Sequence, residues 1–492
     1  MLVVLAALGL AGVAGATDFG ANDDTGKYLG EAAAPYYAQL AGAGLRENVI
    51  SVKWDPFEPE AIPDRAALDA AVTLAQAAGV TVVLALYADR PTAFTTDGGT
   101  PAGFAAWATA VAQAYPQVTE YVVGNEPNQP RFWQPQFDAD GKQVSAAAFG
   151  RVLAATYDAL KGVNPDLEIV GVGLSPRGND SPGAPNNIST SPVRFLDALG
   201  RWYRHSGRTR PLMDGFSFHP YPRANSDKLL RNYGWPNAGV ANLGRIQQAL
   251  WDAFHGTAQP TTVDGLKLTL DEVGWQVDTT GVPGYTGAEN VPVTDEWTQA
   301  LVYGQLVRMM VCQPAVAAVN LFGFVDDAKL AGFQAGLYRV DGTPRPAVDA
   351  VRQAIAETGG TCPGLLASWR VARTVIGATA TFPIALRPLP SVLRGWRFSV
   401  TAGEEASFRA GIFRAGMAGR GLDRVLASAG VVRVARATAA GIVRPTHAPL
   451  VDFGHKTLRP GRYVYAIRLA ATTNAERTTT IVSRPFTVAA RR

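Results

Sequence analysis

The chain is poor in charge, in cysteine and in long apolar runs, and each shortage excludes something. Only 17% of its 492 residues are charged and 47% are hydrophobic, which excludes disorder over most of the chain and leaves a large core. After the N-terminus no apolar run reaches the ~18 residues of a membrane span. Phosphate-binding loops, dinucleotide fingerprints, metal-binding helix motifs and the Gly-x-Ser-x-Gly elbow are absent. We therefore expect no cofactor and no metal.

Cysteine occurs only twice, at Cys312 and Cys362. In an exported protein the two could pair, and closing the loop between them would stabilise the fold by roughly 4 kcal/mol on a chain-entropy estimate. Two buried free thiols are the alternative. Neither the spacing nor neighbouring histidines indicate a zinc site.

The first 16 residues read MLVVLAALGLAGVAGA, an apolar stretch that ends in small residues. This pattern is typical of the later part of a secretory signal peptide with cleavage near Ala16, although the usual basic residues before it are missing. A buried first strand or helix is the alternative. We expect a secreted or cell-envelope protein with no transmembrane segment beyond the signal.

Charge is distributed unevenly along the chain. From Gly364 onward the chain contains 20 basic and 5 acidic residues, whereas the preceding part contains 25 basic and 36 acidic residues. Opposite charge balances predict two domains, residues 17–363 and 364–492. The basic domain either has a solvated, arginine-rich surface or adheres to an anionic envelope polymer. Its few aromatics and the expected export argue against nucleic acid as a partner.

Eight short apolar runs alternate with alanine-rich amphipathic stretches before residue 358. Such runs are typical of parallel strands buried on both faces, and eight repeats predict an α/β fold, a (β/α)8 TIM barrel. A doubly wound sheet is the competing fold, but it usually has fewer repeats, and no Gly-rich phosphate loop follows the first run. The predicted strands are 17–22, 49–54, 81–87, 120–125, 168–173, 215–220, 267–272 and 317–323. The predicted helices are 64–79, 101–115, 145–163, 191–204, 240–256, 294–312 and 345–357.

The pattern changes after residue 363. Helical periodicity fades and short alternating runs appear at 396–400, 406–413, 431–435, 463–469, 478–482 and near 486–488. These runs predict an antiparallel β-sandwich of immunoglobulin or fibronectin type.

Two glutamates end predicted strands of the barrel, Glu126 after the fourth and Glu272 at the seventh. Barrel enzymes place their chemistry at the C-terminal ends of strands, and strands four and seven face each other across the mouth. Two carboxyls so placed can approach to about 5–5.5 Å, the separation of a retaining glycoside hydrolase. Asp271 has the opposite strand parity, so we expect it to face the helices.

Asn125-Glu126-Pro127, with a glutamate ending strand seven, resembles clan A of the glycoside hydrolases, and the surrounding motifs are most similar to the family 39 and family 5 type. The resemblance implies that Glu126 is the acid/base, that Glu272 is the nucleophile, and that Asn125 binds the sugar 2-hydroxyl. His219-Pro220-Tyr221 also matches the clan, in which the tyrosine hydroxyl touches the nucleophile and holds it ionised.

Aromatic residues near the expected mouth are the remaining candidates for substrate binding. Trp54, Trp133 and Trp275 could stack on the apolar faces of sugar rings or could be plain packing. Relatives often carry a tryptophan in strand eight, where this chain has Phe322. His219 could likewise be a buried core histidine.

These features predict an exported retaining glycosidase that cleaves β-linked O-glycosides of an oligo- or polysaccharide through two glutamates. A non-catalytic carbohydrate-binding or envelope-associated protein on the same barrel is one alternative. A transglycosylase that uses the same site is another. The sequence does not select the sugar or the linkage.

Overall fold

The computed structural model describes residues 16–289, 291–364, 375–383, 392–393, 397–417, 420–427, 435–454 and 456–489. The first 15 residues of the predicted signal lie outside this range, as does most of the predicted strand at 431–435. In the described part of the chain no helix is both long and apolar enough to cross a bilayer.

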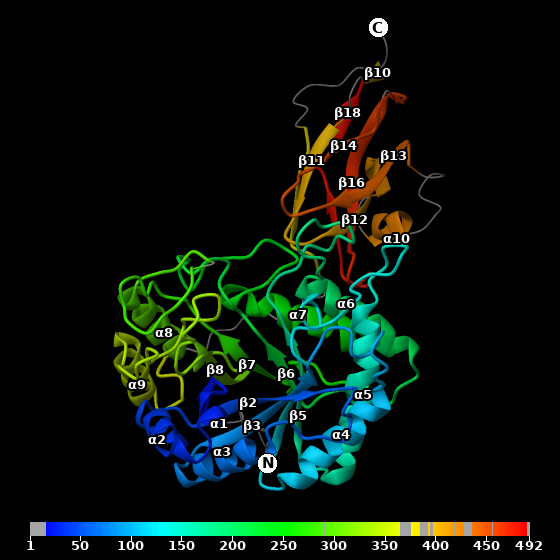
Figure 1. The fold of residues 1–492 in the computed structure, drawn as a ribbon. Helices are drawn as coiled ribbons and strands as arrows, with labels where there is room; N and C mark the ends of the chain where they lie inside the picture. Colours follow the sequence, from blue (N-terminus) through cyan, green and yellow to red (C-terminus); the bar gives the residue numbers. More distant parts are fainter. Residues whose placement is uncertain are drawn as a thin grey trace, which may run out of the picture.

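Eight parallel strands close into a barrel in sequence order, with β1 paired to both β2 and β8 (Figure 1). This confirms the predicted TIM barrel, and every strand overlaps its predicted range. Their bounds are β1 Asp18–Asn22, β2 Glu47–Trp54, β3 Thr81–Ala88, β4 Glu120–Val123, β5 Glu168–Leu174, β6 Gly215–Phe218, β7 Lys267–Val273 and β8 Val316–Phe322.

Helices surround the barrel. Their starts follow the local chemistry: the Thr100 hydroxyl caps α4 through the Gly103 amide, and Asp295 caps α8 through Thr298. Ser145 is the first residue of α5, and its hydroxyl donates to Gln136. The helices are α1 Thr25–Leu29, α2 Ala34–Gly42, α3 Arg65–Ala77, α4 Pro101–Ala114, α5 Ser145–Val163, α6 Pro192–His205, α7 Leu243–Phe254, α8 Glu296–Met310 and α9 Pro346–Thr358. Short 3-10 turns, η1 Gly30–Ala33 and η2 Val240–Asn242, precede α2 and α7.

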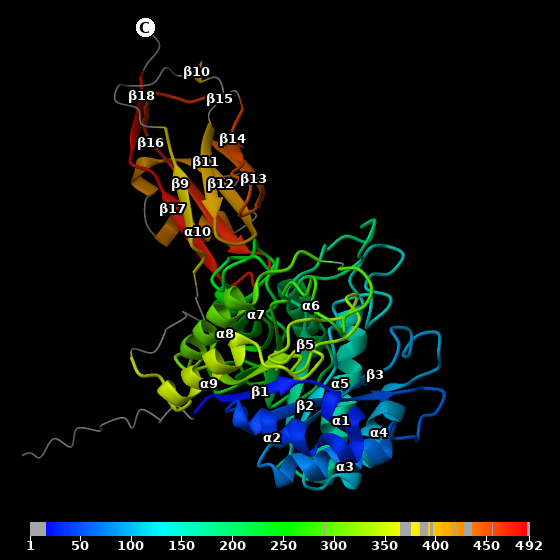
Figure 2. The same ribbon diagram turned by 60° about the vertical axis from the view of Figure 1, so that its left-hand side comes forward.

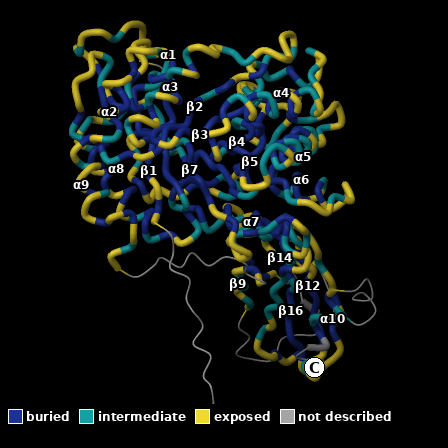
Figure 3. Tube along the Cα trace, turned by 90° about the horizontal axis from the view of Figure 1, so that it is seen from below, coloured by how far each residue is buried: buried dark blue, intermediate teal, exposed yellow. Residues whose placement is uncertain are grey.

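The core lies mainly between the strands and the helices, where residues such as Leu268 and Leu270 of β7 are fully buried. A smaller apolar cluster, which includes Val49, Val83 and Val122, fills part of the barrel interior. Figure 3 shows the buried strands surrounded by exposed loops. Because the core supports the strand ends, side chains placed there are held on a rigid frame.

The C-terminal part is an antiparallel β-sandwich, as the sequence predicts. The sheet β14-β11-β9 packs on the sheet β13-β12-β16-β17 through a shared core that includes Phe398 and Tyr465, while α10 covers the outer face near Phe413. The elements are β9 Ala378–Thr381, β10 Val392–Leu393, β11 Arg397–Ala402, β12 Ala406–Arg414, η3 Ala415–Met417, α10 Arg420–Ala427, β13 Ala437–Val443, β14 Leu450–Asp452, β15 Lys456–Thr457, β16 Gly461–Ala471, β17 Thr478–Val482 and β18 Phe486–Val488.

The predicted cysteine pairing is present. Cys312, just after α8, forms a disulfide with Cys362, just after α9, with their Cα atoms 4.6 Å apart. The bond joins the two last helices of the barrel. The sandwich that follows lies beside α6 and α7 (Figure 2).

Candidate active site

Glu126 lies just beyond β4, in a turn whose backbone is unusual. Its φ of 41° falls in the left-handed region, which non-glycine residues seldom adopt and which clusters at functional sites. The Glu126 amide donates to the Gly173 carbonyl at 2.7 Å. A side chain at position 173 would come within 3.0 Å of the Gly124 carbonyl and 3.3 Å of His219 Nε2. Glycine at 173 therefore allows the ends of β4, β5 and β6 to approach closely and fixes the direction of Glu126.

Glu272 reaches the mouth because β7 is irregular. Leu268 and Leu270 point into the core beneath the helices, and simple alternation would send Glu272 the same way. The register between β7 and β8 shifts between Leu270 and Val273, which turns the Glu272 carboxylate toward the barrel axis. This irregularity is a bulge of the kind found beside active sites.

The two carboxylates converge at the C-terminal mouth of the barrel. An oxygen of Glu126, an oxygen of Glu272 and a ring nitrogen of His219 all lie within 4.8 Å of one another. The glutamate side chains are 17% and 15% exposed, so solvent and a substrate can reach both. The distance between the two carboxylate oxygens, at most 4.8 Å, is close to the ~5–5.5 Å between the carboxyl groups of retaining enzymes. It is well short of the ~6.5–9.5 Å found in inverting enzymes.

His219, from the end of β6, lies between three carboxylates. Its Nδ1 is 3.3 Å from Glu126 Oε1 and 3.5 Å from Glu272 Oε2, and its Nε2 is 3.2 Å from Asp271 Oδ1. Burial by itself lowers the pKa of His219, but the charges of Glu272 and Asp271 outweigh it and raise that pKa well above the ordinary value. Both ring nitrogens face carboxylate oxygens, which suits a doubly protonated ring.

Tyr221 donates its hydroxyl hydrogen to Glu272 Oε2 at 3.0 Å, as the clan resemblance implies. Burial, with the charge of Glu126 adding to it, raises the pKa of Glu272 to about 7, although His219 and the Tyr221 hydroxyl act in the opposite direction. Burial and the charge of Glu272 raise the pKa of Tyr221 well above its usual value. The phenol therefore stays protonated and remains a donor to the carboxylate at any ordinary pH.

Asp271 corrects the sequence-based prediction. We expected it to face the helices, but its carboxylate lies inside the barrel, where it accepts a hydrogen bond from Ser217 and lies against His219. The parity argument was wrong because it assigned the inward face of β7 from Glu272, which only the bulge brings to the mouth. Ser217 and His219 share one face of β6, and this spacing of two residues was the available sign of the arrangement.

Aromatic rings form the wall of the site beside Glu272. Tyr221 lies 6.0 Å from Phe322 and 5.4 Å from Phe333, measured between ring centroids, and the two phenylalanines lie 4.9 Å apart. All three are only partly buried. Phe322 was a predicted substrate contact, whereas Phe333, far along the β8–α9 loop, carried no sequence signal. An apolar wall of this kind suits the C–H face of a sugar ring.

The three tryptophans lie in the core and not at an open sugar platform. Trp54 and Trp275 are each 1% exposed, and their indole nitrogens donate to the backbone carbonyls of Pro59 and Asp227. Trp133 is 5% exposed and stacks on Phe94. Their faces are covered, so the alternative of plain packing describes them, and the prediction of sugar stacking is wrong for this structure.

Asn125 is partly buried at the end of β4, next to Gly173. It borders a small cavity of about 20 Å³, also lined by Tyr87 and Trp133, which is room for one water molecule and too small for a sugar. The implied contact with the 2-hydroxyl stays a prediction.

Within the described ranges, Glu126, His219 and Glu272 are the one group of three His, Cys, Asp or Glu side chains close enough to hold a cation. That the chain needs neither a metal nor a cofactor stays a prediction.

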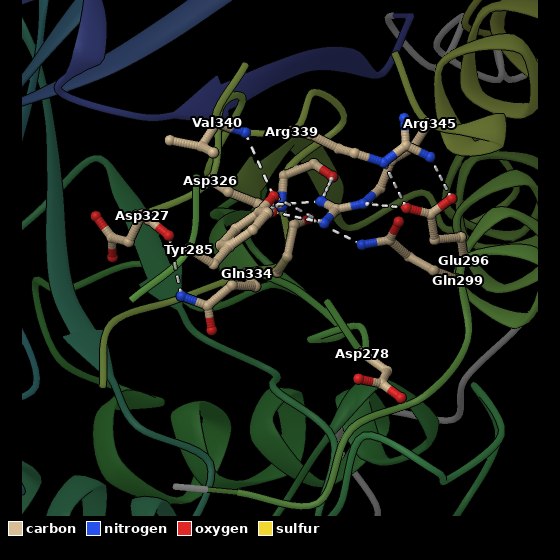
Figure 4. A network of polar contacts seen from close by, with 12 residues as sticks. Asp278, Tyr285, Glu296, Gln299, Asp326, Asp327, Gln334, Arg339, Val340 and Arg345 are labelled. Carbon is tan, nitrogen blue, oxygen red and sulfur yellow. Dashed lines mark hydrogen bonds and ion pairs between the residues drawn. The ribbon is translucent and has the colours of Figure 1, made fainter. Parts of the chain in front are cut away.

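A buried polar network lies among the loops beyond β7 and β8 (Figure 4). Arg345 and Asp326, both with fully buried side chains, pair through two contacts of 2.7 and 2.5 Å. Tyr285 donates to the same aspartate at 2.6 Å, and Arg345 Nε donates to Glu296 at 3.1 Å. The network joins the β7–α8 loop to the β8–α9 loop, which carries Phe333. Asp326 is thus fully engaged within the protein.

Comparison with known proteins gives structural neighbours alone. No family model and no curated protein matches the chain. A family 39 glycoside hydrolase from Bacteroides cellulosilyticus WH2 is 16% identical, with a TM-score of 0.48 over 80% of this chain and 74% of that one. GH5_18 from Streptomyces cattleya, solved with GlcNAc, is 18% identical, with a TM-score of 0.47 over 71% and 82%. An exo-β-1,4-mannosidase from Opitutaceae bacterium strain TAV5 is 15% identical, with a TM-score of 0.43 over 70% and 61%. These neighbours are glycosidases, and at such identities they assign no activity to this chain.

Proposed function

We propose that the protein is a retaining glycoside hydrolase that cleaves β-linked O-glycosides. The observation that supports this most is the convergence of the Glu126 and Glu272 carboxylates within 4.8 Å at the barrel mouth, since that separation suits direct attack on the anomeric carbon by one of them. Both groups are partly exposed and both are hydrogen-bonded or paired by His219.

The surroundings of each carboxylate favour one division of labour. Glu272 receives the Tyr221 hydroxyl and lies beside His219, two contacts that stabilise the ionised form needed in a nucleophile. Glu126 protonates the departing glycosidic oxygen. It then takes a proton from the water that releases the sugar from Glu272.

The substrate is an oligo- or polysaccharide, bound against the aromatic wall of Tyr221, Phe322 and Phe333. Export belongs to the same proposal, supported by the signal-like N-terminus. Attachment to an anionic envelope polymer through the arginine-rich C-terminal domain is supported by its charge alone.

Replacement of each glutamate by alanine tests the proposal. With an aryl β-glycoside, Glu126→Ala and Glu272→Ala should each lose several orders of magnitude in turnover. Azide should rescue both variants, giving a β-glycosyl azide with Glu126→Ala and an α-glycosyl azide with Glu272→Ala. Glu120→Gln, at the opposite end of β4, is the matched control and should keep activity. Full activity of either alanine variant would rule out this function.

Two other functions use the same site and are separated by product analysis. A transglycosylase would give longer products at high acceptor concentration. A non-catalytic carbohydrate-binding protein would bind oligosaccharides and release no sugar from any of them. Since both carboxylates and their supporting contacts are present, the geometry favours catalysis over carbohydrate binding alone.

A further inference from the structure

The C-terminal sandwich is fixed to the barrel by buried polar contacts. Arg477, whose side chain is 2% exposed, lies 2.6 Å from Asp252 of α7 and 2.5 Å from Glu404 of its own domain. Thr473 donates to the same Asp252 oxygen at 2.9 Å. Buried charges held by several partners fix a geometry, because loss of one partner leaves the others uncompensated. The sandwich thus has a defined position on the barrel.

A second contact of the sandwich reaches two loops of the barrel mouth. Arg194 of α6 places its Nη2 3.2 Å from both carboxylate oxygens of Glu405, a residue only 8% exposed. Its Nε lies 3.5 Å from Asp180 in the β5–α6 loop, and its guanidinium carbon lies 5.1 Å from the ring centroid of Trp235 in the β6–α7 loop. One arginine therefore connects the sandwich to both loops.

The β5–α6 loop in turn contacts the catalytic turn after β4. The buried Asn128 side chain donates to the Ser175 carbonyl at 3.1 Å and accepts from the Ser175 amide at 3.0 Å. The Gln129 side chain donates to the Arg177 carbonyl at 2.5 Å, and its own amide donates to the Glu126 carbonyl at 2.8 Å. Displacement of the loop would therefore act directly on the turn that carries Glu126.

The β6–α7 loop reaches the other half of the site. The Gly178 amide donates to the Asn237 side chain at 2.9 Å and joins the two loops to each other. The Tyr233 hydroxyl donates to the Tyr221 carbonyl at 3.0 Å, and Tyr221 is the donor to Glu272. Both loops therefore lead from the sandwich to residues in contact with the reacting groups.

We infer that the C-terminal sandwich positions the loops of the substrate cleft, and that it acts on these loops through the ion pair between Glu405 and Arg194. The pair holds the β5–α6 and β6–α7 loops in the arrangement that binds the part of the substrate beyond the scissile sugar. Arg194 and Glu405 touch no reacting atom, so they act through the loops. The inference rests on the proposed function for its substrate, but its structural part does not.

Two variants break the pair from opposite sides, Glu405→Gln in the sandwich and Arg194→Gln on α6. Arg194 is 38% exposed, so its replacement should leave the fold intact even if Glu405→Gln does not fold. In each variant we expect trypsin to cut after the exposed Arg177 at least tenfold faster, as followed by mass spectrometry. KM for an oligosaccharide should rise at least fivefold, while kcat for an aryl monoglycoside stays within twofold.

Arg397→Gln is the matched control, because Arg397 forms an exposed ion pair with Asp452 far from these loops. It should change neither cleavage nor KM. The effect of the double variant of Arg194 and Glu405 should be smaller than the sum of the two single effects, since both single variants remove the interaction between these two residues. Cleavage after Arg177 at the control rate in both single variants would overturn the inference, whether or not the protein hydrolyses glycosides. Fast cleavage without any glycosidase activity would instead count against the proposed function alone.

Discussion

Removal of the Tyr221 hydroxyl should shift the pH dependence of the reaction. The hydroxyl donates to Glu272 Oε2 at 3.0 Å, and a hydrogen bond to a charged group contributes about 1.5–3 kcal/mol. Since 1.36 kcal/mol corresponds to one pKa unit, Tyr221→Phe should raise the pKa of Glu272 by about 1–2 units. The pKa of Glu272 rises because the Tyr221 hydroxyl, which stabilises the ionised carboxylate by donating to it, is lost in the variant.

The starting point is a pKa of about 7 for Glu272, raised by burial. A nucleophile must be ionised, so kcat/KM should fall tenfold per pH unit below about 7 in the natural protein. At pH 6 roughly a tenth of Glu272 is ionised, and the variant would keep ~1% to 0.1%. We therefore expect kcat/KM of Tyr221→Phe to be about 10–100 times lower at pH 6, with a smaller deficit as the pH rises.

The measurement is kcat/KM for an aryl β-glycoside between pH 4 and pH 10. Tyr87→Phe is the control, because the Tyr87 hydroxyl lies near the site but donates to Ser51 at 3.1 Å and not to a carboxylate. For Tyr87→Phe, the acidic limb of kcat/KM should lie at the same pH as in the natural protein. An acidic limb that does not move in Tyr221→Phe would refute the assignment of Glu272 as the ionised group that this hydroxyl supports.

Three further predictions concern groups around the site and the barrel. Asp271→Asn removes the carboxylate beside His219 Nε2 and should lower the pKa of His219, measured by NMR titration of the imidazole ring; an unmoved pKa would contradict the pairing. Reduction of the Cys312–Cys362 disulfide should lower the free energy of unfolding by roughly 4 kcal/mol, measured in urea with and without reductant, and equal midpoints would contradict it. Arg345→Met leaves Asp326 buried without its cationic partner and should lower the free energy of unfolding by about 3–5 kcal/mol in the same assay. Arg352→Met, at an exposed position, should lower it by less than about 1 kcal/mol.

Much of the fold could be predicted because the barrel repeats one local pattern. Each strand is an apolar run with both faces buried, and most helices have an apolar stripe, so the period along the chain locates all eight strands and the helices from α3 to α9. The helices between β1 and β2, α1 and α2, were not predicted. The sandwich followed from the loss of that period after residue 363. The two glutamates could be located because the fold places every strand end at the same mouth.

The details of the site depend on departures from regular geometry, which the sequence does not mark. The bulge in β7 brings Glu272 to the mouth, while Asp271 also faces inward, against His219, and not the helices as expected. Burial of Trp54 and Trp275 depends on how the loops fold back over them. The sequence alone does not distinguish a loop tryptophan with an exposed face from one whose face is covered. Phe333 lies in the β8–α9 loop, which the buried Arg345 contacts through Asp326 and Gly336, and such tertiary contacts are not marked in the sequence.

The most direct test of the account is to trap the intermediate. A 2-deoxy-2-fluoro β-glycoside with a good leaving group slows release of the sugar from a covalent glycosyl-enzyme more than its formation, so that the ester accumulates. The account predicts one added sugar per chain, located by peptide mass spectrometry on Glu272, and none in Glu272→Gln. A label on Glu126 or on another residue would contradict the assignment, and turnover of the natural glycoside with no trapped ester would contradict the double-displacement mechanism.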